Sequence, residues 1–166
     1  MFTGYVMCFH SIKPILDNNS KILILGTFPS VKSRELHFFY AHPQNRFWPL
    51  MANLLGCSTP LSTNEIKEAL LIRNNIALWD IVASCEVEGS SDTKIKNIKY
   101  NNIKDILSVS QINAIFTNGK KAYDLLIKSN QNCGLPITTL PSTSPANAQF
   151  SFETLKKKWA VILDKI

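Results

Sequence analysis

The sequence predicts an α/β fold, a three-layer α/β/α sandwich around a central, mainly parallel sheet of four strands. Four short apolar segments each end at a turn residue or a polar cluster, which is typical of buried strands. Stretches with a helical spacing of apolar residues lie between them, and this alternation produces right-handed βαβ units. With 166 residues, 45% of them apolar and 18% charged, the chain is expected to form one domain over residues 1–166.

The first expected strand is the apolar run at residues 22–25, which stops at Gly26. A long loop then leads into a helix in which Pro49 suits the first turn and Gly56 suits the C-terminal stop. Asn64 is placed to cap a second helix, because an amide at this position can accept a hydrogen bond from the first turn.

The second expected strand covers residues 76–82 and ends at or near Asp80. The segment that follows, residues 84–100, is polar and carries Gly-Ser-Ser-Asp at its centre, so we expect a loop there. An isoleucine-rich stretch comes next, and the third and fourth expected strands are residues 112–116 and 136–140.

Two further helices complete the alternation. The one after the third strand is expected to bury Ala122, Leu125 and Leu126. The closing helix begins at about Ser151 and repeats apolar residues at helical spacing, namely Phe152, Leu155, Trp159 and Ile162.

Loops that follow parallel strands meet at one edge of the sheet, and open α/β sheets bind their ligands at that edge. The four loops expected there are residues 26–45, 80–92, 117–121 and 141–148. A binding or catalytic site is therefore expected where these loops converge.

Charge and cysteine content narrow the class of protein. The net charge of +6 is compatible with a polyanionic partner, because lysine and arginine displace counterions from phosphates. No apolar run approaches the roughly 20 residues of a membrane span, which favours a cytoplasmic protein without a membrane partner. The four cysteines are far apart in sequence, so we expect reduced thiols and no metal or other cofactor; they are Cys8, Cys57, Cys85 and Cys133.

Common catalytic motifs are missing from the sequence, including the phosphate-binding P-loop, the dinucleotide fingerprint, the nucleophile elbow and the zinc-protease motif. A serine hydrolase that uses Ser142 or Ser144 with His42 and Asp80 stays open as an alternative. It lacks the strained turn that normally exposes such a serine.

The loops instead carry neutral hydrogen-bonding and aromatic side chains. An amide can pair with the edge of a planar heterocycle while an aromatic ring stacks on its face, so this combination is typical of a nucleobase pocket. The residues concerned are Phe28, Asn45, Phe47, Trp48, Ser142, Thr143, Ser144 and Asn147, with Arg46, Lys120 and Lys121 nearby in sequence.

Three segments carry a specific resemblance. They are GTFPS at residues 26–30, HPQNRFWP at residues 42–49 and LPSTSPANA at residues 140–148. In this order they resemble the uracil-DNA glycosylase superfamily and, within it, the DNA-deoxyinosine (hypoxanthine-DNA) glycosylase branch. LWDIVASCEVEGSSD and TNGKKA resemble that branch too, so the likeness covers roughly residues 14 to 160.

The resemblance implies a monofunctional glycosylase of base-excision repair, acting as a monomer on DNA with deaminated bases. It would flip out hypoxanthine first, and uracil stays open as a secondary substrate. By position, Asn45 is the catalytic residue, and Gly26, Thr27, Phe28 and Phe47 bind the base, Phe47 by stacking on it. The residues implied to contact or wedge the DNA are Ser30, His42, Arg46, Lys120, Ser142, Ser144, Pro145, Ala146 and Asn147.

The residues themselves leave alternatives open. Thr27 and Phe28 stand where many superfamily members place a carboxylate or amide that positions water, so a non-catalytic nucleic-acid-binding relative is the second function class. Asn45 could serve as a helix cap instead. Trp48 is expected in the core, and Asp80, at a strand end, is expected to support the site.

Overall fold

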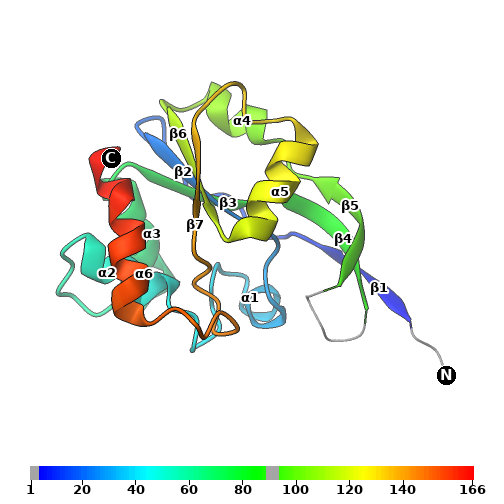
Figure 1. Cartoon of the computed structure of the whole chain (residues 1–166), viewed down its shortest axis with the longest axis horizontal. Helices are drawn as coiled ribbons and strands as arrows, with labels where there is room; N and C mark the ends of the chain where they lie inside the picture. The colour runs from blue at the N-terminus through cyan, green and yellow to red at the C-terminus, as the bar shows by residue number, and fades with distance from the viewer. Residues whose placement is uncertain (1–3, 89–93) are drawn as a thin grey trace.

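The computed structural model describes residues 4–88 and 94–166, and its centre is a four-stranded parallel sheet in the order β3-β2-β6-β7 (Figure 1). The strands are β2 (Ile22–Gly26), β3 (Ile76–Asp80), β6 (Ala114–Asn118) and β7 (Ile137–Leu140). Each lies within two residues of its predicted position, and the predicted α/β fold is confirmed.

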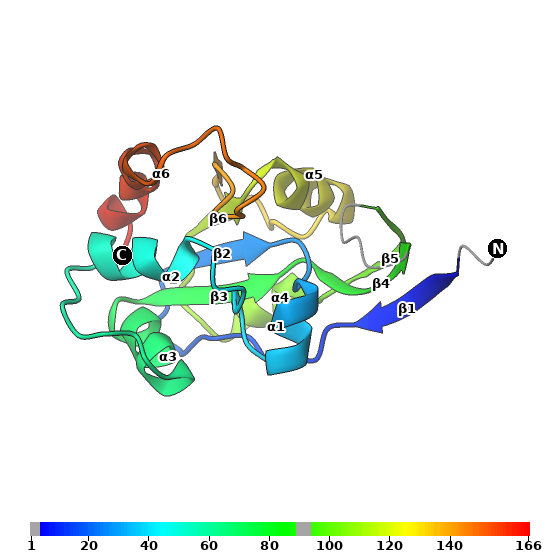
Figure 2. The same cartoon turned by 90° about the horizontal axis from the view of Figure 1, so that it is seen from below.

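Helices cover both faces of this sheet: two groups of helices lie on opposite sides of it in Figure 1, and Figure 2 shows the same arrangement turned by 90°. Ile22 and Ile24 of β2 pack on one face with α2, α3 and α6, and Leu23 and Leu25 pack on the other with α4 and α5. All four side chains are fully buried, which explains the continuous apolar run of this strand. The helices are α2 (Phe47–Leu54), α3 (Asn64–Arg73), α4 (Ile103–Ser108), α5 (Lys120–Ser129) and α6 (Phe152–Trp159), followed by the 3-10 turn η1 (Ala160–Asp164).

The helix boundaries confirm most expectations and correct one. Helix α5 buries the three predicted residues, and the closing helix begins after its cap, Ser151. Helix α3 is capped by Thr63 and not by Asn64. Thr63 has extended backbone angles and its hydroxyl accepts a hydrogen bond from the Ile66 amide, whereas Asn64 already belongs to the first turn.

A second, antiparallel sheet was not predicted. It consists of β1 (Tyr5–Phe9), β4 (Val82–Glu88) and β5 (Ile95–Tyr100), in the order β1-β4-β5. The expected polar loops at residues 80–92 and 84–100 are therefore wrong over the described residues. One face of β4 is more buried than the other, so apolar and polar residues alternate along it, and the segment lacks the continuous apolar run of the central strands. The Gly-Ser-Ser-Asp segment, residues 89–92, lies outside the described residues.

The loop expected at residues 26–45 also contains a short helix, α1 (Val31–Leu36). The Ser30 hydroxyl accepts a hydrogen bond from the Ser33 amide at 3.2 Å and so caps this helix. The chain then returns to the sheet edge, where Phe39, Tyr40 and Asn45 form part of the wall of a pocket.

The central strand β2 should dominate stability, because it is buried on both faces and paired on both edges. Ile24 lies between Leu78 of β3 and Phe116 of β6. We expect Ile24→Ala to lower the free energy of unfolding by about 2–5 kcal/mol in urea denaturation. Val109→Ala, at a side chain that is 60% exposed, is the control and should change it by less than about 0.5 kcal/mol. A similar small loss for both variants would contradict this expectation.

Candidate functional site

A pocket of about 270 Å³ opens at the carboxyl edge of the parallel sheet. Residues from the ends or following loops of all four parallel strands contribute to its wall, as expected from their shared direction. The lining residues are Gly26 to Ser30, Ser33, Phe39, Tyr40, Asn45, Asp80, Asn118 and Ser142 to Ser144.

Asn45 is held in one orientation by two hydrogen bonds to its amide oxygen. Its Oδ1 accepts from the Phe47 backbone amide at 2.9 Å and from the Thr143 hydroxyl at 3.0 Å. A backbone N–H can only donate, so the atom facing it must be the oxygen of Asn45. The Nδ2 group then makes no hydrogen bond within the part of the chain that the structure describes. Asn45 therefore steadies the start of α2 and still offers a donor to a ligand.

The hydroxyl of Thr143 is itself fixed by Asn118. Asn118 donates from Nδ2 to Thr143 Oγ1 at 3.0 Å, and its Oδ1 accepts from the Thr143 amide at the same distance. Thr143 is fully buried, and its hydroxyl accepts from Asn118 and donates to Asn45. The orientation of Asn45 is thus set by Thr143 in the loop after β7 and, through it, by Asn118 at the end of β6. Asn118 was missed as a site residue, although an amide at the end of a parallel strand was a usable signal.

Arg46 anchors the loop after β7. Its guanidinium donates to the carbonyl oxygens of Ser144 at 2.9 Å and Asn147 at 3.1 Å, and it also bonds the carbonyl oxygens of Phe150 and Thr143. The sequence-based expectation of a DNA contact is corrected here, because these donors are committed to the protein backbone. The planar guanidinium of arginine can hold several carbonyl oxygens at once, because its N–H donors point in different directions from one rigid group.

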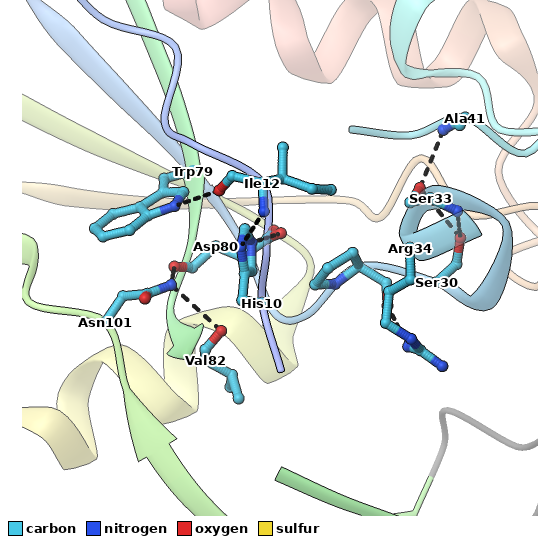
Figure 3. A network of polar contacts seen from close by, with 11 residues as sticks. His10, Ile12, Ser30, Ser33, Arg34, Ala41, Trp79, Asp80, Val82 and Asn101 are labelled. Atoms are coloured by element: carbon cyan, nitrogen blue, oxygen red, sulfur yellow. Dashed lines mark hydrogen bonds and ion pairs between the residues drawn. The ribbon is translucent and has the colours of Figure 1, made fainter. Parts of the chain in front are cut away.

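Asp80 lies at the end of β3 and is 3% exposed. Its Oδ2 lies 2.8 Å from Nε2 of His10, and the Ile12 amide donates to His10 Nδ1 at 3.3 Å (Figure 3). Because Nδ1 accepts, Nε2 carries the proton and donates to the carboxylate. His10 comes from the segment before β2, 70 residues away in sequence, and no motif pointed to it.

Gly26 is required by the close approach of two side chains to its backbone. A methyl group on its Cα would clash with Oδ1 of Asp80 and lie 2.8 Å from the Tyr40 hydroxyl. That hydroxyl is buried without a hydrogen-bond partner among the described residues. Burial, and secondly the nearby Asp80 carboxylate, raise the pKa of Tyr40, while the Asn118 side chain opposes the shift more weakly. The phenol therefore stays protonated and able to donate.

The aromatic side chains expected at the site lie partly in the pocket and partly in the core. Phe47 is fully buried, stacks on Tyr40 with ring centroids 4.3 Å apart and does not line the pocket, so the expectation that it stacks on a base is wrong. Its position in the first turn of α2 points the ring into the core. Trp48 is a core residue, as predicted. Phe28 is half-buried and lines the pocket, with the Arg34 guanidinium 5.3 Å from its ring centroid.

The other residues predicted to contact DNA lie in different places in the structure. Ser30, Ser142 and Ser144 line the pocket. His42 instead lines a separate cavity, and Lys120 forms an exposed ion pair with Asp124 at 2.7 Å. Residues 145 and 146, Pro and Ala, lie exposed at the tip of the loop after β7, and residue 147, Asn, donates to the Ser142 carbonyl. Their role as a wedge stays a prediction.

The serine hydrolase alternative is contradicted by geometry. His42 does not line the pocket that contains Ser142 and Ser144, and the histidine bound to Asp80 is His10. Among residues 4–88 and 94–166, no three His, Cys, Asp or Glu side chains gather in a way that could hold a metal ion. Within the same residues, no helix has the length and apolarity needed to cross a membrane.

Comparisons with known proteins agree on one family. The family model described as the uracil DNA glycosylase superfamily matches residues 14–164. A hypoxanthine DNA glycosylase from Methanosarcina barkeri is 33% identical over 150 residues, covering 89% of this chain and 92% of that protein. One from Methanosarcina acetivorans is 34% identical over 151 residues, covering 89% and 93%. The solution NMR structure of a candidate uracil DNA glycosylase from Methanosarcina acetivorans has a TM-score of 0.80 at 32% identity, covering 92% of this chain and 95% of that one.

The crowding around Gly26 predicts a steric cost for any side chain there. We expect Gly26→Ala to lower the free energy of unfolding by about 1–3 kcal/mol, because the Asp80 carboxylate and Tyr40 must both move. Gly4→Ala is the matched control, since an added methyl group at Gly4 meets nothing within 4 Å. Thermal or urea unfolding measures both, and equal stability of the two variants would refute the crowding.

Removing the hydrogen bonds of Arg46 should loosen the loop after β7. Arg46→Met keeps an unbranched apolar stem and loses every side-chain donor, so we expect a loss of about 2–3 kcal/mol in unfolding free energy. Backbone amides of residues 141–150 should also exchange faster with deuterium. Arg73→Met, at an exposed arginine in the last turn of α3, is the control. Unchanged exchange in residues 141–150 would show that Arg46 does not hold this loop.

Proposed function

The chain belongs to the uracil DNA glycosylase superfamily, and we propose that it is a monofunctional DNA glycosylase that removes hypoxanthine from DNA. The names of the two curated relatives support hypoxanthine as the principal substrate. Uracil is proposed as a secondary substrate because it presents a similar N–H and carbonyl edge. The observation that carries the proposal is the Asn45 amide, whose oxygen is committed within the protein and whose NH2 group is left for a ligand.

The reaction breaks the bond between the sugar C1′ and the base nitrogen, and the electron pair leaves with the base. A site accelerates this step when donors stabilise the charge that develops on the leaving base. Asn45 Nδ2 and the Tyr40 hydroxyl are such donors, and the raised pKa of Tyr40 keeps its proton in place at neutral pH. A water oxygen then bonds to C1′, and its proton neutralises the departed base.

The shape of the pocket supports recognition of one base. Its volume of about 270 Å³ lies just below the roughly 300–1,000 Å³ of sites that hold drug-sized ligands, which favours a single planar ring system. Extruding a base from the stack costs a few kcal/mol, and stacking on Phe28 would offset part of that cost. The exposed tip at Pro145 and Ala146 is proposed to fill the gap left in the DNA.

The non-catalytic alternative was based on the lack of a polar side chain at Thr27 and Phe28. In the fold, the Asp80 carboxylate occupies the space directly over Gly26 and lines the same pocket. The pocket therefore contains an acidic group next to the glycine that begins the GTFPS segment, and this supports the enzyme over the binding protein.

A strand containing one deoxyinosine tests the proposal. After incubation with the protein, alkali should break the strand at that position, and without alkali the strand should stay intact. Asn45→Ala should lower the single-turnover rate by about 100- to 1,000-fold, because a leaving-group donor is lost, while DNA affinity changes by only a fewfold. Asn53→Ala, at an exposed amide in α2, is the control.

Two results would count against the proposal. A wild-type protein that binds the strand and never produces an alkali-labile site would be the non-catalytic relative. An Asn45→Ala variant that loses binding and cleavage equally would place Asn45 in the framework of α2 and not in the reaction.

A further inference from the structure

The antiparallel sheet ends in two different edge strands. Its order is β1-β4-β5, so β1 and β5 form its edges within the part of the chain that the structure describes. An edge strand presents backbone N–H and C=O groups without a neighbouring strand, and it pairs readily with another chain unless its sequence prevents this. In Figure 1 and Figure 2, β1 projects from one end of the molecule.

The edge formed by β5 is protected against such pairing. Lys96 and Lys99 are exposed in this strand. Between them, Asn97 has a positive φ of 52°, and the register with β4 shifts at this place. Exposed lysines and irregular register are two of the devices with which proteins keep edge strands from binding other chains.

The edge formed by β1 is regular and apolar instead. The strand has the sequence YVMCF, without a charged residue or a proline, and its register with β4 is unbroken along its whole length. Its alternate side chains Tyr5, Met7 and Phe9 share one face and are 42%, 44% and 67% exposed. An edge of this kind pairs with another strand by adding it to the sheet.

The register with β4 determines which backbone groups of β1 face the open edge. His10 follows the strand and continues its register opposite Ala83, and the His10 amide donates to the Ala83 carbonyl at 2.8 Å. In an antiparallel ladder, hydrogen-bonded pairs alternate with pairs that are not hydrogen-bonded. Val6 and Cys8 therefore also bond to β4, and the N–H and C=O groups of residues 5, 7 and 9 point to the open edge.

We propose that β1 pairs antiparallel with β1 of a second copy of this chain. The outward groups are arranged symmetrically about Met7, so a two-fold axis between the two Met7 residues makes each outward N–H face an outward C=O of the other copy. Met7 then lies opposite Met7, and Tyr5 lies opposite Phe9 in both halves. Cross-strand aromatic pairs stabilise antiparallel strands, so the side chains fit this register as well as the backbone does.

The charges near β1 allow two copies to approach, although the net charge of each is +6. Glu88 of β4 lies opposite Tyr5, and the Lys96 ammonium lies over the Tyr5 ring, so both signs occur beside the same residue. Consecutive lysines at residues 156–158 belong to α6, which lies at the other end of the molecule in both views (Figure 1 and Figure 2). Pairing through β1 therefore keeps these lysines of the two copies apart.

The contact is small, so the dimer should be weak. Two paired strands of this length bury less than the roughly 1,600 Å² of a standard protein interface. We expect a dissociation constant on the order of 100 µM. This dimer replaces the monomer that the family resemblance implies, and it does not depend on the proposed glycosylase function.

Analytical ultracentrifugation of the whole chain without DNA tests the pairing. Between about 10 µM and about 1 mM, the mean mass of the wild type should rise from near 18.7 kDa toward twice that value. Met7→Pro removes an outward N–H and leaves the bonds to β4 in place, so it should weaken the association at least about 30-fold. Met7→Ala, the matched control, keeps that N–H and should weaken the association less than about 5-fold.

Hydrogen exchange of the wild type gives a second readout that needs no variant. It is followed by NMR at about 50 µM and about 1 mM, where the proportions of monomer and dimer differ. The amides of Tyr5, Met7 and Phe9 should exchange about 3-fold more slowly at the higher concentration, because the partner strand accepts their hydrogen bonds. The amides of β5, at the protected edge, are the control and should keep their rates.

Four results would overturn the proposal. The first is a wild type that stays monomeric up to about 1 mM. The second is a dimer in which the amides of Tyr5, Met7 and Phe9 keep their exchange rates, because it would use another surface. The third is equal association of folded Met7→Pro and Met7→Ala. The fourth is a monomer whose β1 binds a strand of a different protein, which would assign the edge to that partner.

A variant that fails to fold leaves the proposal testable. If Met7→Pro is unfolded by circular dichroism, the exchange rates of the wild type decide. Slower exchange of the three outward amides at the higher concentration supports pairing through β1, and unchanged rates overturn it.

Discussion

The site depends on the two hydrogen bonds that the amide oxygen of Asn45 accepts. One comes from the backbone at the start of α2 and the other from the Thr143 hydroxyl in the loop after β7. They join two segments that are 98 residues apart and leave the amide nitrogen as the part of Asn45 that can meet a ligand. A group that could be an acceptor or a donor in solution thereby becomes a donor in the folded protein. Its proposed chemistry, stabilising a leaving base, follows from that restriction.

Three further constraints keep the pocket in shape. Arg46 holds the loop after β7 through its backbone carbonyls, so the residue beside Asn45 serves the framework and not the ligand. Gly26 leaves room for Asp80 and Tyr40 to approach the end of β2. Asn118 directs the Thr143 hydroxyl toward Asn45. The polar groups left for a ligand are consequently few, and they lie at the carboxyl ends of parallel strands, where the loops converge.

Much of the fold could be predicted from the sequence, because fully buried strands leave long apolar runs and amphipathic helices leave a clear period. The antiparallel sheet was not predicted. The alternation of apolar and polar residues in β4 is the pattern of a strand with one buried face, but the high polar content of this segment favoured a loop, and β1 carries mostly exposed side chains. Within the site, Asn45 could be reached through its motif. His10 could not, since its contact with Asp80 spans 70 residues and depends on tertiary packing. Phe47 and Arg46 were misassigned because a motif records residue types and not burial, and both side chains are used by the protein interior.

The most direct test of the central claim is an NMR titration that follows the Asn45 side-chain amide and the Phe47 backbone amide. The protein is titrated with a duplex that contains a non-cleavable deoxyinosine analogue. If Asn45 binds the base through Nδ2 while its oxygen stays committed, the Asn45 NH2 resonances should shift on binding. The Phe47 amide should then keep its protection from hydrogen exchange. Loss of protection at Phe47, with the Asn45 NH2 resonances unchanged, would mean that Asn45 turns its oxygen toward the base and would contradict the donor role.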